Sequence, residues 1–150
     1  MLWISIILCI VLFEWRNKKK MDQNLKFNQS IEKWNGRIIL KKYYNKGAAL
    51  DTLSKHPKLL IRITMGFILV LFFCLLKIIR TPKQYTKKLA FSLILGGAIS
   101  NFLDRITKHY VIDYFSFSWK KIRHIVFNIA DFCIFIGSML LILVSLKEKK

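Results

Sequence analysis

The sequence has little of three residue types, and each shortage excludes a class of protein. Its three cysteines and three histidines do not fall at the spacing of metal ligands. We therefore expect neither a disulfide framework nor a metal site, and no cofactor is indicated. Acidic residues are the third type, since eight aspartates and glutamates stand against 26 lysines and arginines. Because carboxylates beside apolar segments are costly, the few that lie there are the first candidates for function.

The rest of the composition is that of an integral membrane protein. The 150 residues are 54% hydrophobic, yet the formal net charge is +18. A soluble domain rarely combines these two properties, whereas apolar segments separated by basic loops explain both. The charge alone is also typical of nucleic-acid binders, but the apolar segments disfavour nucleic acid as a partner. The length indicates a single domain, residues 1–150.

Four apolar segments are candidates for membrane helices, so we predict an all-α membrane protein with four transmembrane helices. Their expected bounds are about 2–18, 59–79, 89–106 and 125–146. No basic region precedes the first segment and no small-residue cleavage motif follows it, so we expect a helix there rather than a signal peptide. The third segment reaches spanning length only if the polar residues 101–105 belong to the helix.

A basic region at about residues 19–58 separates the first two helices. Within it, RIILKKYY at residues 37–44 predicts a strand, which the turn signal NKG at residues 45–47 ends. Four spans place both termini on one side of the membrane and this region on the other. The loop at 80–88 and the tail at 147–150 are basic, as cytoplasmic segments should be. The region at 19–58 carries more lysine and arginine, so charge alone leaves the orientation open.

Counting helices brings polar residues of separate helices to one face. The first and third helices run in the same direction, so Glu14 and Lys18 should lie level with the end of the third helix. There, Asn101, Asp104 and Arg105 occur at i, i+3 and i+4 and share one helix face. The sequence therefore predicts a polar cluster at this face.

Two structural interpretations of the third helix stay open beside the functional one. Asp104 is alternatively half of an ion pair at the helix end, with Arg105 or Lys108 as its partner. A stripe of small residues, Ser92, Gly96 and Ser100, predicts close packing against another helix.

A pair of aspartates carries the chemistry that we expect. Asp113 follows the third helix, and Asp131 lies one turn into the fourth, three residues after Asn128. Two carboxylates in one low-dielectric site share a proton, so one can act as base on a water while the other donates to a scissile carbonyl. This is aspartic-protease chemistry and needs no metal. Alternatively, Asp131 is a structural carboxylate stabilised by the dipole at a helix N-terminus.

Aromatic residues gather near the predicted helix ends. Tyr110, Tyr114 and Trp119 are placed as interfacial belt residues are. The loop at residues 110–124 is expected to cover the outer side of the aspartate pair, as a lid would.

Four motifs, in order along the chain, resemble those of signal peptidase II, the lipoprotein signal peptidase family. They are NKGAA at 45–49, GGAISNFLDR at 96–105, VIDY at 111–114 and FNIAD at 127–131. The resemblance implies four helices in the bacterial plasma membrane, both termini in the cytoplasm and a small extracellular β-cradle from the first long loop. It also implies cleavage just before the diacylglyceryl-modified cysteine of a prolipoprotein, and inhibition by globomycin-type peptides.

The resemblance also implies roles for particular residues. Asp113 and Asp131 correspond to the catalytic dyad. The first helix of the family normally ends with an aspartate followed four residues later by a lysine, and here the pair is Glu14 and Lys18, which adds one methylene. The residues expected to support the dyad and substrate are Asn45, Asn101, Asp104, Arg105, Asn128, Glu14 and Lys18.

Two other functions are compatible with an intramembrane carboxylate pair. One is a non-catalytic membrane protein of the same scaffold that binds lipidated peptides without cutting them. The other is a small ion or proton carrier, which would need acidic residues near the middle of the membrane. The acidic residues here gather at one face, which favours an accessible active site.

Overall fold

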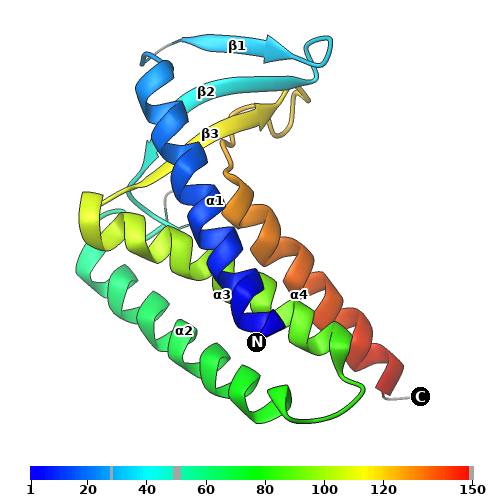
Figure 1. Ribbon diagram of the computed structural model, residues 1–150. Coiled ribbons are helices and arrows are strands. Elements are labelled where there is room, and N and C mark those ends of the chain that lie inside the picture. The colour runs from blue at the N-terminus through cyan, green and yellow to red at the C-terminus, as the bar shows by residue number, and fades with distance from the viewer. Residues whose placement is uncertain (28, 49–51, 149–150) are drawn as a thin grey trace.

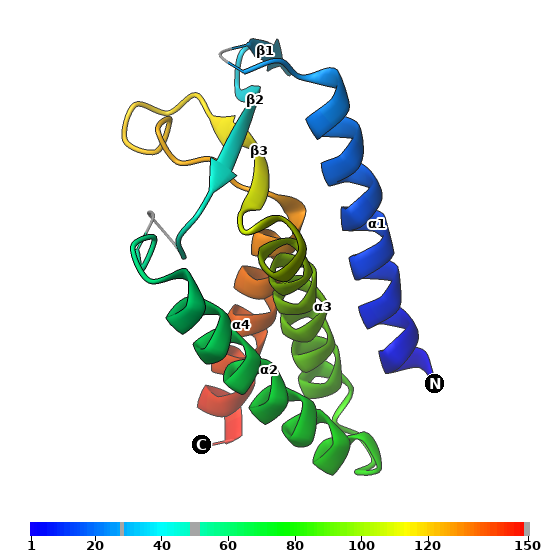
Figure 2. The same cartoon turned by 90° about the vertical axis from the view of Figure 1, so that its left-hand side faces the viewer.

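Four helices and one small sheet make up the residues that the computed structural model describes, 1–27, 29–48 and 52–148. The elements follow in the order α1 (Leu2–Asn24), β1 (Ser30–Lys33), β2 (Ile38–Asn45), α2 (Pro57–Ile79), α3 (Tyr85–Lys108), β3 (Val111–Phe117) and α4 (Ile129–Glu148). The sheet lies at one end of the helices, and both chain termini lie toward the other end (Figures 1 and 2). The chain therefore has a helical body with a small sheet at one end.

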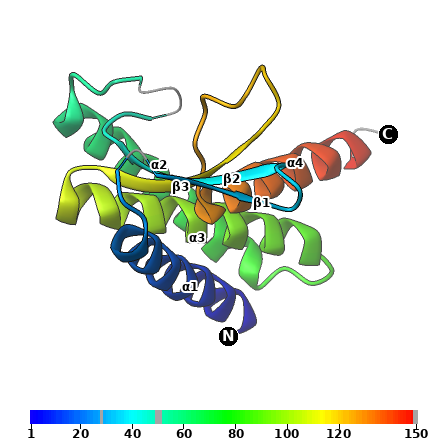
Figure 3. The same ribbon diagram turned by 90° about the horizontal axis from the view of Figure 1, so that it is seen from above.

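Three helices of the described part of the chain are long and apolar enough to cross a membrane, namely α2, α3 and α4. More than half of the apolar stretch of α3 is buried (56%), whereas the apolar stretches of α2 and α4 are mostly exposed (17% and 11% buried). Thus α3 is the central helix, and α1, α2 and α4 all pack against it (Figure 3). It includes residues 101–105, which is why it reaches 24 residues. The exposed faces of α2 and α4 carry large apolar side chains such as Phe73 and Leu143, as lipid-facing helices do.

The predicted small residues of α3 are contact points for its neighbours. Ser92 and Gly96 are buried, and a Cβ added at Gly96 would lie 2.9 Å from Cδ1 of Ile10 in α1. On the adjoining face, Gly97 lies against the backbone of Ala130 at the start of α4. The packing interpretation of the small stripe is confirmed, because side chains here would separate the helices.

The first helix is longer than predicted, because α1 continues to Asn24 instead of ending near residue 18. Two contacts with β2 hold its last turns. The hydroxyl of Tyr44 donates to Asp22 Oδ1 at 2.6 Å, and Lys42 Nζ lies 3.2 Å from the same oxygen. The apolar residues of α1 lie in its first half, and its second half is charged.

The sheet is antiparallel, with the strand order β1-β2-β3. The strand predicted at residues 37–44 is confirmed as β2, but β1 and β3 were not predicted. The expectation that the first long loop alone builds the sheet was wrong, because β3 follows α3. Residues 111–117 are therefore a strand and not part of a lid loop. Five of these seven residues are β-branched or aromatic, namely Val111, Ile112, Tyr114, Phe115 and Phe117, and such side chains suit a strand that pairs with β2.

The last helix begins later than expected. The predicted start near residue 125 is wrong, because Phe127 still pairs with Phe115 of β3 in an isolated bridge, and α4 begins at Ile129. This later start changes the position of Asp131, which lies in the first turn of α4.

Candidate active site

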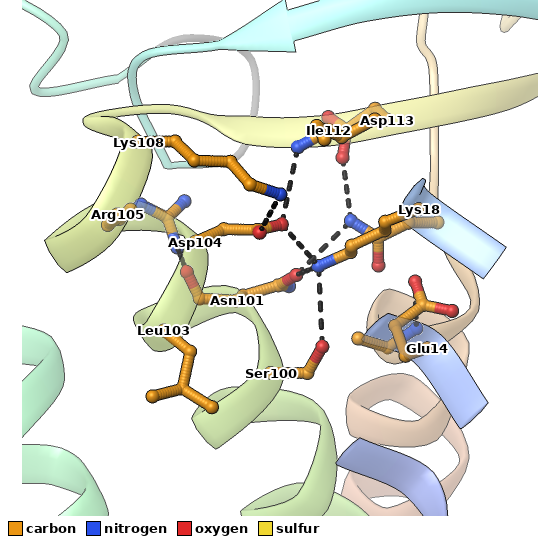
Figure 4. A network of polar contacts seen from close by, with 12 residues as sticks. Glu14, Lys18, Ser100, Asn101, Leu103, Asp104, Arg105, Lys108, Ile112 and Asp113 are labelled. Carbon is orange, nitrogen blue, oxygen red and sulfur yellow. Dashed lines mark hydrogen bonds and ion pairs between the residues drawn. The ribbon is translucent and has the colours of Figure 1, made fainter. Parts of the chain in front are cut away.

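A polar centre lies where α1, α3, β3 and the start of α4 meet at the sheet end of the helices (Figure 4). Eight of the nine predicted site residues form one connected set of hydrogen bonds and ion pairs. These eight are Lys18, Asn45, Asn101, Asp104, Arg105, Asp113, Asn128 and Asp131. The ninth, Glu14, joins the site through β3 and α4.

The ammonium group of Lys18 lies in the middle of the polar centre. It donates to Oδ1 of Asn101 at 2.8 Å and to Oγ of Ser100 at 3.4 Å, and it forms a 2.9 Å ion pair with Asp104. Only 1% of Lys18 is exposed, so these partners replace the water that a lysine normally keeps. The contact joins α1 to α3, as counting helices predicted.

Asp104 is the ion-pair partner of two lysines. Its Oδ2 faces Lys18, and its Oδ1 lies 2.8 Å from Lys108 Nζ, one turn along α3. Of the two partners proposed from the sequence, Lys108 is therefore confirmed, and Arg105 does not form this pair. The same carboxylate accepts a long 3.5 Å hydrogen bond from the backbone N–H of Ile112. Asp104 thus fixes the start of β3 beside the end of α3.

The turn between α3 and β3 explains why Asp113 points into the site. His109 ends α3 in the left-handed conformation, with φ of 66°, which reverses the chain direction. Alternate residues of a strand face opposite sides. Asp113 and Phe115 therefore share one side of β3, and Tyr114 faces the other.

Two amides hold the carboxylate of Asp113. Nδ2 of Asn45 donates to its Oδ2 at 3.0 Å, and Nδ2 of Asn128 donates to its Oδ1 at 2.6 Å. Asp113 is 2% exposed. Burial and the neighbouring charge of Asp131 raise the pKa of Asp113 to about 7, and the two amide hydrogen bonds oppose the rise. At neutral pH this carboxyl group is therefore poised between its two protonation states.

Asp131 and Asn128 cap each other at the start of α4. The backbone N–H of Asn128 donates to Asp131 Oδ2 at 3.0 Å, and the N–H of Asp131 donates to Asn128 Oδ1 at 3.0 Å. This reciprocal pattern is a capping box. Asp131 therefore occupies the N-terminal turn that the structural interpretation required, and it does not lie one turn inside the helix.

The other oxygen of Asp131 faces the network. Its Oδ1 accepts from Nδ2 of Asn101 at 2.8 Å. Oδ1 of Asn101 in turn accepts from Lys18 and, at 3.2 Å, from Nδ2 of Asn128. Two asparagines thus link both carboxylates to the buried ammonium group.

Arg105 connects α3 to the segment after β2. Its Nη2 donates to the carbonyl oxygen of Gly47 at 2.7 Å, and Oδ1 of Asn45 accepts from the N–H of Gly47 at 2.9 Å. Arg105 therefore holds the Asn45 turn over the site. The last residue of the NKGAA motif, Ala49, lies outside the described residues.

Sequence reasoning missed the role of Tyr114. It was predicted as an interfacial aromatic residue, but only 3% of it is exposed, and its hydroxyl donates to Oε2 of Glu14 at 2.9 Å. The two residues are 100 positions apart, so no local pattern points to the contact. Among the described residues, no group of three histidines, cysteines, aspartates or glutamates is placed to hold a metal ion.

The apolar helices and the carboxylate-bearing polar centre define a multi-pass membrane protein with an enzyme-like site. A family model described as signal peptidase (SPase) II matches residues 6–147. The chain belongs to the signal peptidase II family, a family of membrane proteases.

Curated relatives are named lipoprotein signal peptidase. One from Haemophilus ducreyi is 32% identical, over 99% of this chain and 92% of its own length. One from Listeria monocytogenes is 31% identical, over 95% and 91%. One from Clostridium tetani is 37% identical, over 74% of both chains. The similarity therefore covers nearly the whole chain.

Two solved structures, each described as a bacterial membrane enzyme, have the same fold. One superposes with a TM-score of 0.84 at 24% identity, covering 99% of this chain and 89% of the other. The second gives 0.83 at 26% identity, covering 97% and 92%. The sheet and the helical body are thus arranged here as in known membrane enzymes.

Proposed function

We propose that this protein removes the signal peptide from diacylglyceryl-modified prolipoproteins, cutting the peptide bond just before the lipidated cysteine. Asp113 and Asp131 are the proposed catalytic dyad. The observation that carries the proposal is the single residue, Asn128, that hydrogen-bonds to both carboxylates within one buried centre. Structural carboxylates are usually neutralised one by one, whereas a dyad needs two that are held together.

In the proposed reaction, the dyad carries one proton. One carboxylate accepts a proton from water as the water oxygen bonds to the scissile carbonyl carbon. The protonated partner transfers its proton to the carbonyl oxygen, which gives a gem-diol. Breakdown re-forms the carbonyl group, breaks the C–N bond and delivers a proton to the amine nitrogen of the lipidated cysteine. The pKa of Asp113, about 7, supports this residue as the partner that holds the proton at neutral pH.

The remaining predicted residues have supporting roles in this proposal. Lys18 and Asp104 hold α1, α3 and β3 together, and Asn101 orients Asp131. Arg105 holds the Asn45 turn, so that Asn45 reaches Asp113. We further propose that globomycin-type peptides inhibit the enzyme by occupying this centre.

For the membrane, we propose that α1 is a fourth span and that the sheet is extracellular, with both termini in the cytoplasm. The 23 residues of α1 and its packing on α3 support a span. Alkaline phosphatase, which is active only outside the cytoplasm, tests the orientation. Inserted at the β1–β2 turn, residues 34–36, it should be active, and fused to the C-terminus it should be inactive. The reverse pattern of activity would mean that the protein has the opposite orientation in the membrane.

The function is tested with purified protein in detergent and a diacylglyceryl-modified prolipoprotein, with cleavage followed by gel shift. The parent should cleave the substrate, and Asp113→Asn and Asp131→Asn should each abolish cleavage. Both variants should have unfolding temperatures near that of the parent. Binding without cleavage by a folded parent would instead identify the non-catalytic peptide binder. Cleavage that survives either substitution would mean that the dyad is assigned to the wrong carboxylates.

A further inference from the structure

The first turn of α4 has an unusual set of hydrogen-bond partners. The N–H groups that begin a helix have no partner within the helix. Here Asn128 accepts from the N–H of Asp131, but the two preceding N–H groups bind residues far away in the sequence. The N–H of Ile129 donates to the hydroxyl oxygen of Tyr114 at 3.3 Å, and that of Ala130 donates to Oε1 of Glu14 at 3.4 Å.

Glu14 and Tyr114 are also bound to each other. The hydroxyl of Tyr114 donates to Oε2 of Glu14 at 2.9 Å, and the two residues are 0% and 3% exposed. Lys18, one turn further along α1, makes its 2.9 Å ion pair with Asp104. Both hydrogen bonds of Glu14 thus lead to β3 and α4. A buried carboxylate needs such donors, and the positive end of a helix dipole favours it.

The position of this pair couples it to both proposed catalytic residues. Tyr114 and Glu14 bind the N–H groups of the first two residues of α4, Ile129 and Ala130. Asp131 is the next residue of the same turn. Tyr114 follows Asp113 directly and faces the opposite side of β3. The strand β3 therefore carries Asp113 and also Tyr114, which holds the helical turn that contains Asp131.

We propose that Glu14 and Tyr114 are positioning residues that cap α4 from outside the helix and set the location of Asp131 relative to Asp113. The inference rests on the proposed function of the two aspartates. Neither residue of the pair touches the reacting atoms. Because catalysis is sensitive to displacements of about 1 Å, loss of the cap acts on the rate of the chemical step and leaves substrate binding nearly unchanged.

The kinetic test compares Tyr114→Phe, Glu14→Gln and the double variant with the parent. Tyr114→Phe keeps the aromatic ring and loses only the hydroxyl. It should lower kcat by about 10- to 100-fold, with KM changed less than about twofold. The double variant should be no slower than the slower single variant, because the two residues act as one unit.

Tyr44→Phe is the matched control. Tyr44 also lies in the sheet and also donates to a carboxylate of α1, Oδ1 of Asp22, at 2.6 Å. Its ring packs against Phe27 and Tyr110, neither of which belongs to α4. Loss of the Tyr44 hydroxyl weakens the attachment of α1 to the sheet, and kcat should stay within about twofold of the parent. An equal fall in kcat for Tyr44→Phe would mean that general attachment of α1 matters and that the cap does not.

Amide hydrogen exchange gives a second readout that needs no activity. In Tyr114→Phe and Glu14→Gln, peptides that cover the first turn of α4 should exchange at least about tenfold faster, with the end of α4 unchanged. Tyr44→Phe should leave this turn protected. Unchanged exchange and unchanged kcat in Tyr114→Phe would overturn the proposal, as would a rise in KM at constant kcat.

The two proposals fail in different ways. An inactive parent, or an active Asp131→Asn variant, would refute the proposed function. In that case the exchange of the first turn still decides whether Glu14 and Tyr114 cap α4. An active parent that depends on Asp131, together with unaffected kcat in Tyr114→Phe, would refute the positioning pair alone.

Discussion

The side-chain amide of Asn128 donates a 2.6 Å hydrogen bond to Oδ1 of Asp113. The same residue exchanges two 3.0 Å hydrogen bonds with Asp131 through its backbone N–H and its Oδ1. One buried side chain on a helix N-cap therefore fixes the distance between a strand and a helix. We therefore expect Asn128 to set the separation between the carboxylates of Asp113 and Asp131.

Replacing Asn128 should damage catalysis more than folding. Asn128→Ala removes the donor to Asp113 and the N-cap of α4, and loss of a cap costs about 1 kcal/mol. We expect kcat to fall about 100-fold, because the side chain that joins Asp113 to the first turn of α4 is lost, although the backbone N–H of residue 128 still binds Asp131. The unfolding temperature should decrease by a few degrees. Kinetics and thermal unfolding in detergent measure both effects. Near-parental kcat in a folded Asn128→Ala variant would contradict this role.

The pH dependence should report Asp113. Its pKa is raised to about 7 by burial and by the charge of Asp131. In the proposed reaction Asp113 must hold a proton, so the rate should fall as the pH rises through about 7. Initial rates measured between pH 5 and 9 test this expectation. A rate that stays constant up to pH 9 would exclude Asp113 as the proton-holding partner.

Asn45→Ala should shift the fall in rate at alkaline pH to higher pH. The 3.0 Å hydrogen bond from Asn45 stabilises the ionised form of Asp113 and so lowers its pKa. Without that bond the pKa of Asp113 should rise further, and the rate should persist to higher pH although its maximum decreases. A shift of the alkaline limb to lower pH would show that Asn45 does not act on Asp113 in this way.

The parts of the fold that were predicted are those encoded locally. Long apolar segments predicted α2, α3 and α4, and the motif order predicted the residues that meet at the polar centre. The central position of α3 also follows from its small residues, since Gly96 and Gly97 permit close approach. The apolar segments and the small residues are local signals, whereas the meeting of Lys18, Asp113 and Asp131 was predicted from counting helices and from the order of the motifs.

The parts that were missed depend on distant partners. The strand β3 was assigned to a loop, because its pairing with β2 joins residues such as Tyr43 and Asp113 that are 70 positions apart in sequence. The start of α4 was placed early because the apolar segment begins before Phe127, whose backbone is bound to β3. The burial of Tyr114 required the position of Glu14, which no spacing rule gives.

The ion pair of Lys18 and Asp104 should be important for stability. Both side chains are almost fully buried, so Asp104→Asn leaves an ammonium group without its charged partner, which typically costs about 3–5 kcal/mol. Lys108→Met is the control, because Lys108 contacts the other oxygen of Asp104 but its side chain is 32% exposed. That loss should cost about 0–1 kcal/mol. Thermal unfolding of both variants checks the order, and equal destabilisation would show that Lys18 is not the dominant partner.

A glycine of α3 should control where α4 begins. A Cβ at Gly97 would collide with the carbonyl oxygen of Ala130 and would lie 2.8 Å from Cγ1 of Ile134, so Gly97→Ala must push the start of α4 away. Overpacking of this kind costs about 1–3 kcal/mol. Because Asp131 follows Ala130 directly, cleavage activity should fall together with stability.

Gly66→Ala provides the matched comparison for Gly97→Ala. A Cβ at Gly66, in the exposed part of α2, would meet nothing within 4 Å, so the same substitution changes backbone preference without a clash. Alanine is favoured over glycine within a helix by about 0.5–1 kcal/mol. Gly66→Ala should therefore unfold at or above the parental temperature and cleave at the parental rate. If Gly97→Ala behaved in the same way, the close approach of α3 and α4 would not be what positions Asp131, and the aspartate would depend on its polar partners alone.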